Sequence, residues 1–305
     1  MPELPEVEIT SRELSRRAGG LRIRDVWSDY GSARHRARDD IKNRKFFAAF
    51  KRTVVGKKIL SIARRAKNIL INLEDDITIL VHMKLTGHFL YGRYSFDPKN
   101  NRWETTERGH LRDAPNRFVR LVFTLSNGKR LAFSDLRRFA RVTFFPTVQT
   151  AERPELKKLG PEPLAPSFNF ERFKECLLLR PRDGIKQALM NQETIAGIGN
   201  IYSDEILWLA GVHPLERAGN IGGKKLRGLY RAMKKILGEA IRAGGDSDSD
   251  FRRLGGEEGG YQKRQRAYHR TGERCEKKGC RGVIARIKIG GRSAHFCPVH
   301  QRKGD

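Results

Sequence analysis

Three cysteines and one histidine near the end of the chain constrain its local fold more than any other feature of the sequence. Cys275 and Cys280 are separated by four residues, Cys297 and His300 are separated by two, and sixteen residues lie between the pairs. Two close pairs joined by a short connection can supply the four ligands of a tetrahedral zinc site, because each pair chelates from one turn. The spacing predicts one structural Zn²⁺ with Cys3His ligation.

The segment between the two pairs predicts a β-hairpin. Residues 283–289 alternate in polarity, Gly290 and Gly291 suit a two-residue turn, and residues 292–296 return from it. Basic side chains share one face of the first strand, and Arg292 directly follows the tip. We expect this rigid basic tip to contact phosphate or a groove of a nucleic acid.

The charge of the whole chain indicates a polyanionic partner. The sequence contains 62 Lys and Arg against 35 Asp and Glu, which gives a formal net charge of +27. A folded chain this basic most often binds nucleic acid, and the other interpretation is a basic surface of a ribosome-associated kind. No apolar run is long enough to span a membrane and no signal peptide is recognisable, so we expect a cytoplasmic protein whose cysteines bind metal.

Hydrophobic periodicity divides the chain into a mostly β half and a mostly helical half. Asn127-Gly128 is a strong hairpin signal, and residues 92–116 are polar and predict a loop or an insertion. We expect an α+β protein with a mostly β domain at 1–150, a linker at 151–166, a helical domain at 167–262 and a zinc hairpin at 263–305. The predicted helices are 3–18, 169–179, 184–191, 200–210 and 224–243, and the predicted strands of the first half are 58–63, 69–73, 77–83, 117–125, 130–134 and 140–145.

A tight turn precedes one of the predicted helices. Gly197 and Gly199 bracket Ile198 and allow the backbone to approach a ligand closely. We expect Asn200 to cap the helix that follows, whose N-terminus could bind a phosphate. A plain helical hairpin explains the same residues equally well.

The first residues suit covalent chemistry. Removal of Met1 would leave Pro2 with a free secondary amine, whose pKa of about 8 is far below that of lysine. Such an amine can attack a carbonyl-like carbon, and Glu3 and Glu6 are close enough along the chain to move its protons. The alternative is an ordinary helix start with acids in its first turn.

Taken together, six segments resemble the bacterial formamidopyrimidine-DNA glycosylases of the Fpg/Nei family. They occur in the family's order and span the chain from end to end. Leucine at position 4 is similar to the Fpg branch, whereas the Nei branch usually has glycine there. The segments are residues 1–8 (MPELPEVE), 64–67 (RRAK), 86–87 (TG), 135–139 (DLRRF), 196–205 (AGIGNIYSDE) and 290–298 (GGRSAHFCP).

The resemblance implies a mechanism and roles. Pro2 would attack C1′ of the damaged nucleotide, and Glu3 would act as general acid and base with Glu6 in support. Lys67 would hold the phosphate near the lesion. The implied activity is excision of oxidised purines followed by β- and δ-elimination. Asn200 and Arg292 would grip the DNA backbone, Arg137, Phe139 and Leu85 would fill the space left by the extruded base, and His82, Gly199 and Tyr268 would also contact DNA.

The implied fold is a β-sandwich domain with flanking helices, followed by a helical domain with a helix-two-turn-helix motif and a zinc-finger β-hairpin. Its partner would be double-stranded DNA with an oxidised base or abasic site, bound by a monomer. Four features depart from the family pattern: Leu85 replaces a usual methionine, the metal site is Cys3His with one wide pair, residues 92–116 are longer than usual, and residues 244–260 do not reveal which base fits the lesion-sensing loop.

Three other interpretations remain open from the sequence. A Nei-like enzyme for oxidised pyrimidines would use the same Pro2 chemistry on another substrate. A DNA-binding protein without catalysis would not need Pro2, Glu3, Glu6 and Lys67. A zinc-stapled RNA-binding protein explains the basic charge but gives no reason for the N-terminal proline.

Overall fold

The chain folds into two compact units. The computed structural model describes residues 1–31 and 39–303. Unit 1 comprises residues 1–156 and 243–260, and unit 2 comprises residues 157–242 and the chain from residue 261 onward. The loop 243–260 therefore belongs to the same unit as the N-terminus. In the described part of the chain, no helix combines the length and the apolar character that a membrane span requires.

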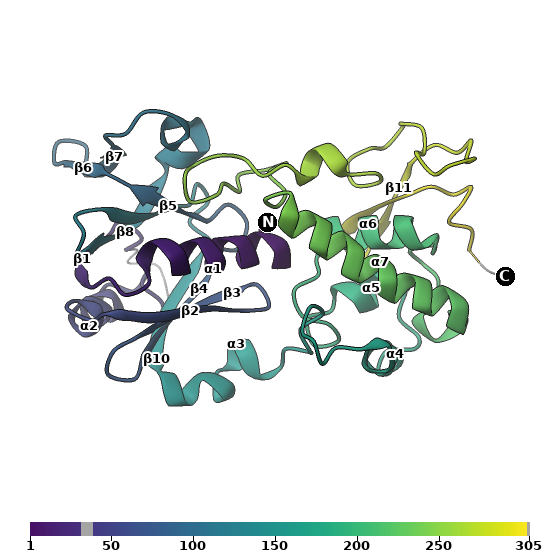
Figure 1. Ribbon diagram of the computed structural model, residues 1–305, viewed down its shortest axis with the longest axis horizontal. Coiled ribbons are helices and arrows are strands. Elements are labelled where there is room, and N and C mark those ends of the chain that lie inside the picture. Colours follow the sequence, from purple (N-terminus) through teal and green to yellow (C-terminus); the bar gives the residue numbers. More distant parts are fainter. Residues whose placement is uncertain (32–38, 304–305) are drawn as a thin grey trace. The chain divides into compact units, whose positions relative to one another are not determined.

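Unit 1 is a sandwich of two four-stranded antiparallel sheets (Figure 1). Phe89 and Phe133 of one sheet share a single buried cluster with Ile79 and Val142 of the other, which shows that the sheets pack face to face. The first sheet has the order β1 (Ile23–Ser28), β8 (Val119–Leu125), β9 (Arg130–Ser134) and β5 (His88–Gly92), and the second has the order β10 (Arg141–Pro146), β4 (Ile77–His82), β3 (Asn68–Leu73) and β2 (Ile59–Arg65).

Two helices flank the sandwich. α1 (Leu4–Ala18) contributes Val7 and Leu14 to the common core, and α2 (Arg44–Val54) contributes Phe50. The sequence pattern predicted α1 but missed α2, together with β1 and β5. A capping signal for α2 was present, because the side chain of Asn43 accepts hydrogen bonds from the first turn of that helix.

Residues 92–116, expected to be a loop or an insertion, are more ordered than the polar composition indicated, so the first alternative, a loop, was wrong. They form the hairpin β6 (Tyr94–Asp97) and β7 (Arg102–Thr105), followed by the 3-10 turns η1 (His110–Arg112) and η2 (Ala114–Arg117). Tyr94 and Leu111 pack on Leu90 and Val122, on the other side of the sheet from the sandwich core. This second apolar layer explains why β5 is buried at every position and shows no alternation.

Unit 2 contains the expected helices and the expected hairpin. All four predicted helices are confirmed with small shifts at their ends, and Gly290 and Gly291 both have positive φ at the turn of the hairpin, which only glycine adopts readily. Its elements are α4 (Phe170–Leu178), α5 (Ile185–Met190), α6 (Asn200–Ala210), α7 (Gly223–Arg242), β11 (Ala285–Ile289) and β12 (Arg292–Phe296). The remaining short elements of the chain are η3 (Thr147–Glu152), α3 (Pro154–Lys157), η4 (Ala218–Asn220) and η5 (Tyr261–Arg264).

Candidate active site and nucleic-acid interface

The N-terminal residues singled out by the sequence lie at the buried start of α1. Pro2 is buried, and Glu3 and Glu6 are only 2% and 1% exposed. Glu3 and Glu6 form a capping box, in which each side chain accepts from the other residue's backbone N–H, and Glu6 Oε2 lies 2.8 Å from the nitrogen of Glu3. The capping box thus fixes both carboxyl groups in the first turn of the helix, directly after Pro2 in the chain.

Glu6 also connects α1 to the loop 243–260. Its second oxygen, Oε1, accepts a hydrogen bond of 2.8 Å from the backbone N–H of Asp246. The preceding residue, Gly245, has φ of +82°, and a Cβ there would lie 3.1 Å from Glu6 Oε1. Glycine is therefore required twice at this position, by conformation and by space. The loop that resembles the family's lesion sensor is thus anchored to the residues that carry the proposed chemistry.

Lys67 projects from a tight turn between β2 and β3. Arg65 and Asn68 pair across the turn, and Ala66 adopts φ of +53°, a conformation that costs a non-glycine residue free energy. The side chain of Lys67 is largely buried, at 7% exposure. Strained backbone of this kind persists where the surrounding structure fixes it, and here the strained residue directly precedes the lysine.

His82, at the end of β4, is held as a neutral imidazole. Burial first, and then the ammonium groups of Lys84 and Lys67, lower the pKa of His82 to about 3. Its Nδ1 accepts the backbone N–H of Lys84 at 3.0 Å, which leaves Nε2 to carry the proton. His82 can therefore donate one hydrogen bond at neutral pH without adding charge.

A buried aspartate organises the loop between β9 and β10. Asp135 is fully buried and accepts hydrogen bonds from Tyr30 Oη at 2.7 Å, Thr86 Oγ1 at 2.5 Å and the N–H of Ala140 at 2.9 Å. Burial and then the Asp135 carboxylate raise the pKa of Tyr30 well above its ordinary value, so its hydroxyl stays a donor. Through Thr86, this aspartate ties the β9–β10 loop to the turn that carries Leu85.

The loop between β9 and β10 exposes an aromatic ring beside a guanidinium group. Phe139 is 47% exposed, and the guanidinium of Arg137 lies 4.5 Å from the centre of its ring. Leu85 is half-buried in the turn after β4. The sequence motif identified Arg137 and Phe139 as candidate site residues. It gave no role to Asp135, Tyr30 or Thr86, because hydrogen bonds between buried polar residues produce no periodic pattern in the sequence.

The turn before α6 differs from the prediction at one residue. Gly199 is the N-cap and Asn200 is the first helical residue, so the expectation that Asn200 caps the helix was wrong. Gly199 adopts extended backbone there, with φ of −136°. Asn200 Oδ1 is buried and finds no hydrogen-bond partner among the residues that the structure describes. The side-chain amide of Asn200 thus keeps hydrogen-bonding capacity for a ligand at the helix N-terminus.

The four predicted metal ligands come together in unit 2. Their ligand atoms all lie within 4.8 Å of one another, with Cys280 Sγ 3.6 Å from Cys297 Sγ and Cys275 Sγ 3.3 Å from His300 Nδ1. The edge of a tetrahedral zinc site is about 3.8 Å, so the cluster fits one metal ion of that size. His300 Nε2 lies 3.0 Å from the Trp208 carbonyl oxygen and can donate to it, which leaves Nδ1 for the metal.

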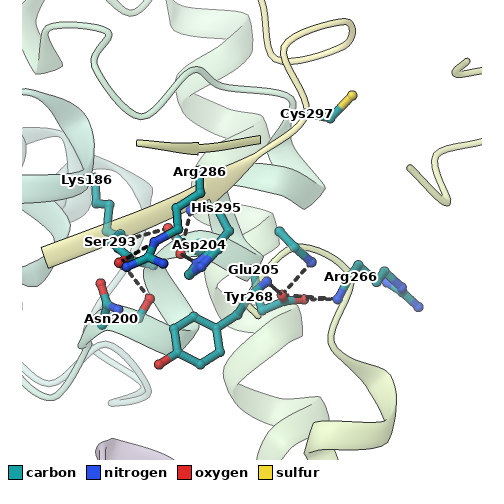
Figure 2. A network of polar contacts seen from close by, with 12 residues as sticks. Lys186, Asn200, Asp204, Glu205, Arg266, Tyr268, Arg286, Ser293, His295 and Cys297 are labelled. Carbon is teal, nitrogen blue, oxygen red and sulfur yellow. Dashed lines mark hydrogen bonds and ion pairs between the residues drawn. The ribbon is translucent and has the colours of Figure 1, made fainter. Parts of the chain in front are cut away.

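Tyr268 is placed by a buried carboxylate that the sequence analysis did not assign. Glu205 accepts hydrogen bonds of 2.9 to 3.1 Å from the backbone N–H groups of Arg266, Ala267 and Tyr268 (Figure 2). Burial raises the pKa of Glu205 to about 7, against the lowering effect of these N–H groups. The ring of Tyr268 stacks on His269 at a centroid distance of 4.1 Å.

Comparison with known proteins identifies the family. Residues 1–142 match the formamidopyrimidine-DNA glycosylase N-terminal domain, and residues 159–252 match the H2TH domain of the same enzymes. The chain belongs to the formamidopyrimidine-DNA glycosylase family. A formamidopyrimidine-DNA glycosylase from Pelotomaculum thermopropionicum is 35% identical over 302 residues, which cover 99% of both chains.

Solved structures of formamidopyrimidine-DNA glycosylases agree over the whole length. Lactococcus lactis Fpg in complex with DNA containing an abasic site has a TM-score of 0.82 and 31% identity, and the match covers 99% of this chain and 100% of that one. A structure of MutM with DNA containing carbocyclic 8-oxo-G has a TM-score of 0.81 and 32% identity at the same coverage. The α+β fold predicted from the sequence is therefore confirmed.

Proposed function

We propose that this chain is a bifunctional DNA glycosylase and abasic-site lyase that removes oxidised purines, 8-oxoguanine and formamidopyrimidines, during base excision repair. The carrying observation is the buried start of α1, where Pro2 and Glu3 sit beside a Glu6 carboxylate anchored to the loop 243–260. Family membership supports the substrate class, because one similar structure holds abasic-site DNA and another holds 8-oxo-G DNA.

The proposed chemistry begins at the amine that removal of Met1 exposes on Pro2. The nitrogen lone pair attacks C1′ of the damaged nucleotide, and the bond from C1′ to the base breaks as the base takes up a proton. Glu3, the residue next to Pro2 in the chain, delivers and collects protons in base loss and ring opening. The resulting iminium acidifies the neighbouring C–H bond, which permits β- and then δ-elimination of the flanking phosphates.

Other residues position the DNA in this proposal. Lys67 holds the phosphate near the lesion, and Asn200 and Arg292 grip the backbone. Phe139 and Leu85 occupy the space left by the extruded base, and Arg137 donates to the orphaned partner base. His82, Gly199 and Tyr268 are proposed as further DNA contacts.

We further propose that the metal is one structural Zn²⁺. Three thiolates and an imidazole at tetrahedral spacing are a donor set that zinc prefers, and bound zinc would hold the two ends of the hairpin together.

We also propose a division of the chain into domains at 1–150, 151–166, 167–262 and 263–305. The protein is proposed to act as a monomer in the bacterial cytoplasm, near the nucleoid.

Borohydride trapping tests the reaction. The substrate is a duplex with one 8-oxoguanine opposite cytosine, and the wild-type protein is compared with a Pro2→Gly variant and with protein whose terminal amine is acetylated. We expect a covalent adduct with wild type and none with acetylated protein. Trapping only on an oxidised pyrimidine would replace the proposal with the Nei-like alternative, and no adduct on any lesion would leave a DNA-binding protein without this chemistry.

A further inference from the structure

Strand β12 is paired on both of its edges, but only one partner is a strand. One edge pairs with β11, in register from Ile289–Arg292 to Ala285–Phe296. On the other edge, the ammonium of Lys186 donates to the carbonyl of Ser293 at 2.7 Å, and the carboxylate of Asp204 accepts the N–H of His295 at 2.9 Å (Figure 2). Backbone groups two residues apart face the same edge of a strand, so these two side chains take the place of a neighbouring strand.

The two side chains that pair this edge form a buried ion pair. Lys186 Nζ lies 2.5 Å from Asp204 Oδ1, and both side chains are 1% exposed. The ring of His295 adds a contact of 3.0 Å between its Nδ1 and Asp204 Oδ2. Burying two charges costs a large desolvation free energy, so such a pair contributes little net stability, but it imposes a defined geometry on the groups it binds.

The ion pair contacts the hairpin beside its predicted phosphate-binding residue. Ser293, whose carbonyl Lys186 binds, directly follows Arg292, and its hydroxyl also accepts from Arg286 Nε at 2.9 Å. Asp204 lies one turn into α6, the helix that begins at Asn200. The ion pair therefore connects the hairpin tip to the helix N-terminus within unit 2.

We propose that Lys186 and Asp204 are positioning residues, which hold Arg292 at a fixed distance from Asn200 so that both can bind phosphates of one DNA strand at once. The inference rests on the proposed function, because it assumes that Arg292 binds DNA. A basic hairpin held only by its metal could pivot about the ligands. The edge contacts at Ser293 and His295 remove that freedom before DNA arrives, and preorganised contacts lose less entropy on binding.

A double-mutant cycle tests the positioning role. Equilibrium affinity for a duplex with a non-cleavable abasic-site analogue is measured for wild type, Arg292→Ala, Asp204→Asn and the double variant. We expect Asp204→Asn to weaken binding about tenfold, and Arg292→Ala to add little in that background, because coupled residues are not additive. Tyr230→Phe is the matched control: it removes a 2.9 Å hydrogen bond to the Phe168 carbonyl elsewhere in unit 2, and it should show no coupling to Arg292.

An apolar replacement separates positioning from folding. Lys186→Met combined with Asp204→Leu removes both buried charges together, so neither charge is left without its partner. We expect this variant to remain folded and to retain its metal, yet to bind DNA as weakly as Asp204→Asn.

Three results would overturn the inference. Wild-type affinity in the apolar variant would show that the edge contacts do not place Arg292. Full additivity of Asp204→Asn and Arg292→Ala would show that the two act independently. Unchanged affinity in Arg292→Ala alone would remove the phosphate role assumed under the proposed function, and the positioning role with it, whereas trapping through Pro2 would still report on the chemistry.

Discussion

The start of α1 and the hairpin β11–β12 are held in place by different physics. The acids that follow Pro2 lie at the start of a helix that contributes Val7 and Leu14 to the large apolar core of the sandwich. The hairpin packs on a small cluster that includes Trp208, Ile284 and two of the metal ligands. Its position depends on the ligand set and on the Lys186–Asp204 pair.

The difference follows from the amount of apolar surface that each region can bury. A two-stranded hairpin is marginally stable alone, so it needs a metal or a packed neighbour, whereas a sandwich supplies its own core. The residues proposed to react thus lie on a unit that supplies its own core. Arg292, the proposed phosphate-binding residue, lies on a hairpin that needs a metal or a packed neighbour, so we expect DNA binding to be lost before the sandwich unfolds.

Metal removal should produce the largest difference in stability between the hairpin and the sandwich. We expect a strong chelator, or Cys297→Ser, to lower DNA affinity at least 100-fold while the sandwich stays folded, because structural zinc contributes roughly 10 kcal/mol or more in small metal-dependent domains. Hydrogen exchange followed by mass spectrometry reports both regions in one sample: protection should vanish in 285–296 and persist in 119–134.

The control for metal removal is Cys176→Ser, since Cys176 is buried in α4 away from the ligand cluster. It should leave DNA affinity and metal content unchanged. If the same concentration of chelator also melted the sandwich, the two regions would not be stabilised independently.

Opposite dependence on pH is the second expected difference. In unit 1, burial lowers the pKa of His88 to about 4, so the unfolded state takes up protons first and stability falls as pH drops from about 6.5 toward 4. In unit 2, the folded state holds a proton on Glu205 up to pH of about 7, so stability falls as pH rises from about 4.5 toward 7. Each effect amounts to about 3 kcal/mol at most.

Exchange protection across pH 4.5 to 7 in the two units measures this contrast. We expect protection of β5 and β9 to rise with pH and protection of 261–268 to fall, after correction for intrinsic exchange rates. Glu205→Gln should flatten the second trend and leave the first intact. If protection changed with pH in the same direction in both units, groups other than His88 and Glu205 would control the pH dependence.

The sequence was most informative where residues form local patterns. The ligand spacing, the Gly290-Gly291 turn and the helical periodicity each depend on neighbours along the chain, and the structure confirms the elements they predicted. The N-terminal motif likewise placed Glu3 and Glu6 together, because residues three apart at a helix start are neighbours. These features required no knowledge of tertiary contacts.

Contacts between distant segments could not be predicted in this way. Lys186 and Asp204 are 18 residues apart and meet Ser293 about a hundred residues later, and a charged residue in a helix ordinarily predicts solvent exposure. Asp135 binds Tyr30 across 105 positions. The interpretation of 92–116 as a loop failed for the same reason, since Tyr94 and Leu111 are buried only by a sheet face formed elsewhere.

Gly245→Ala should weaken the N-terminal site selectively. The new Cβ would approach Glu6 Oε1 and the ring of Phe251, each to 3.1 Å, at a positive φ. We expect about tenfold slower base excision, because the loop would move away from Glu6 or shift its carboxylate. Gly128→Ala is a matched control: its φ is +79°, but nothing lies within 4 Å of the added atom.

Both glycine variants should lose about 1–2 kcal/mol of stability from backbone strain, so thermal melts alone do not distinguish them. Single-turnover excision does, because only Gly245→Ala disturbs Glu6. Equal slowing in both variants would mean that general destabilisation, and not the Glu6 contact, limits the rate.

Leu85→Met should have the smallest effect. The substitution nearly conserves volume, and Leu85 is half-buried in a turn already fixed through Thr86 and Asp135. Phe139, with Arg137 over its ring, presents more apolar surface to a base stack, so it should dominate wedging. We expect excision of 8-oxoguanine opposite each of the four bases to change less than about threefold, with Phe139→Ala as the contrasting variant. A change above tenfold opposite one base would instead make Leu85 a determinant of opposite-base preference, and would show that the rigid unit 1, and not only the fastened hairpin, tunes which DNA is accepted.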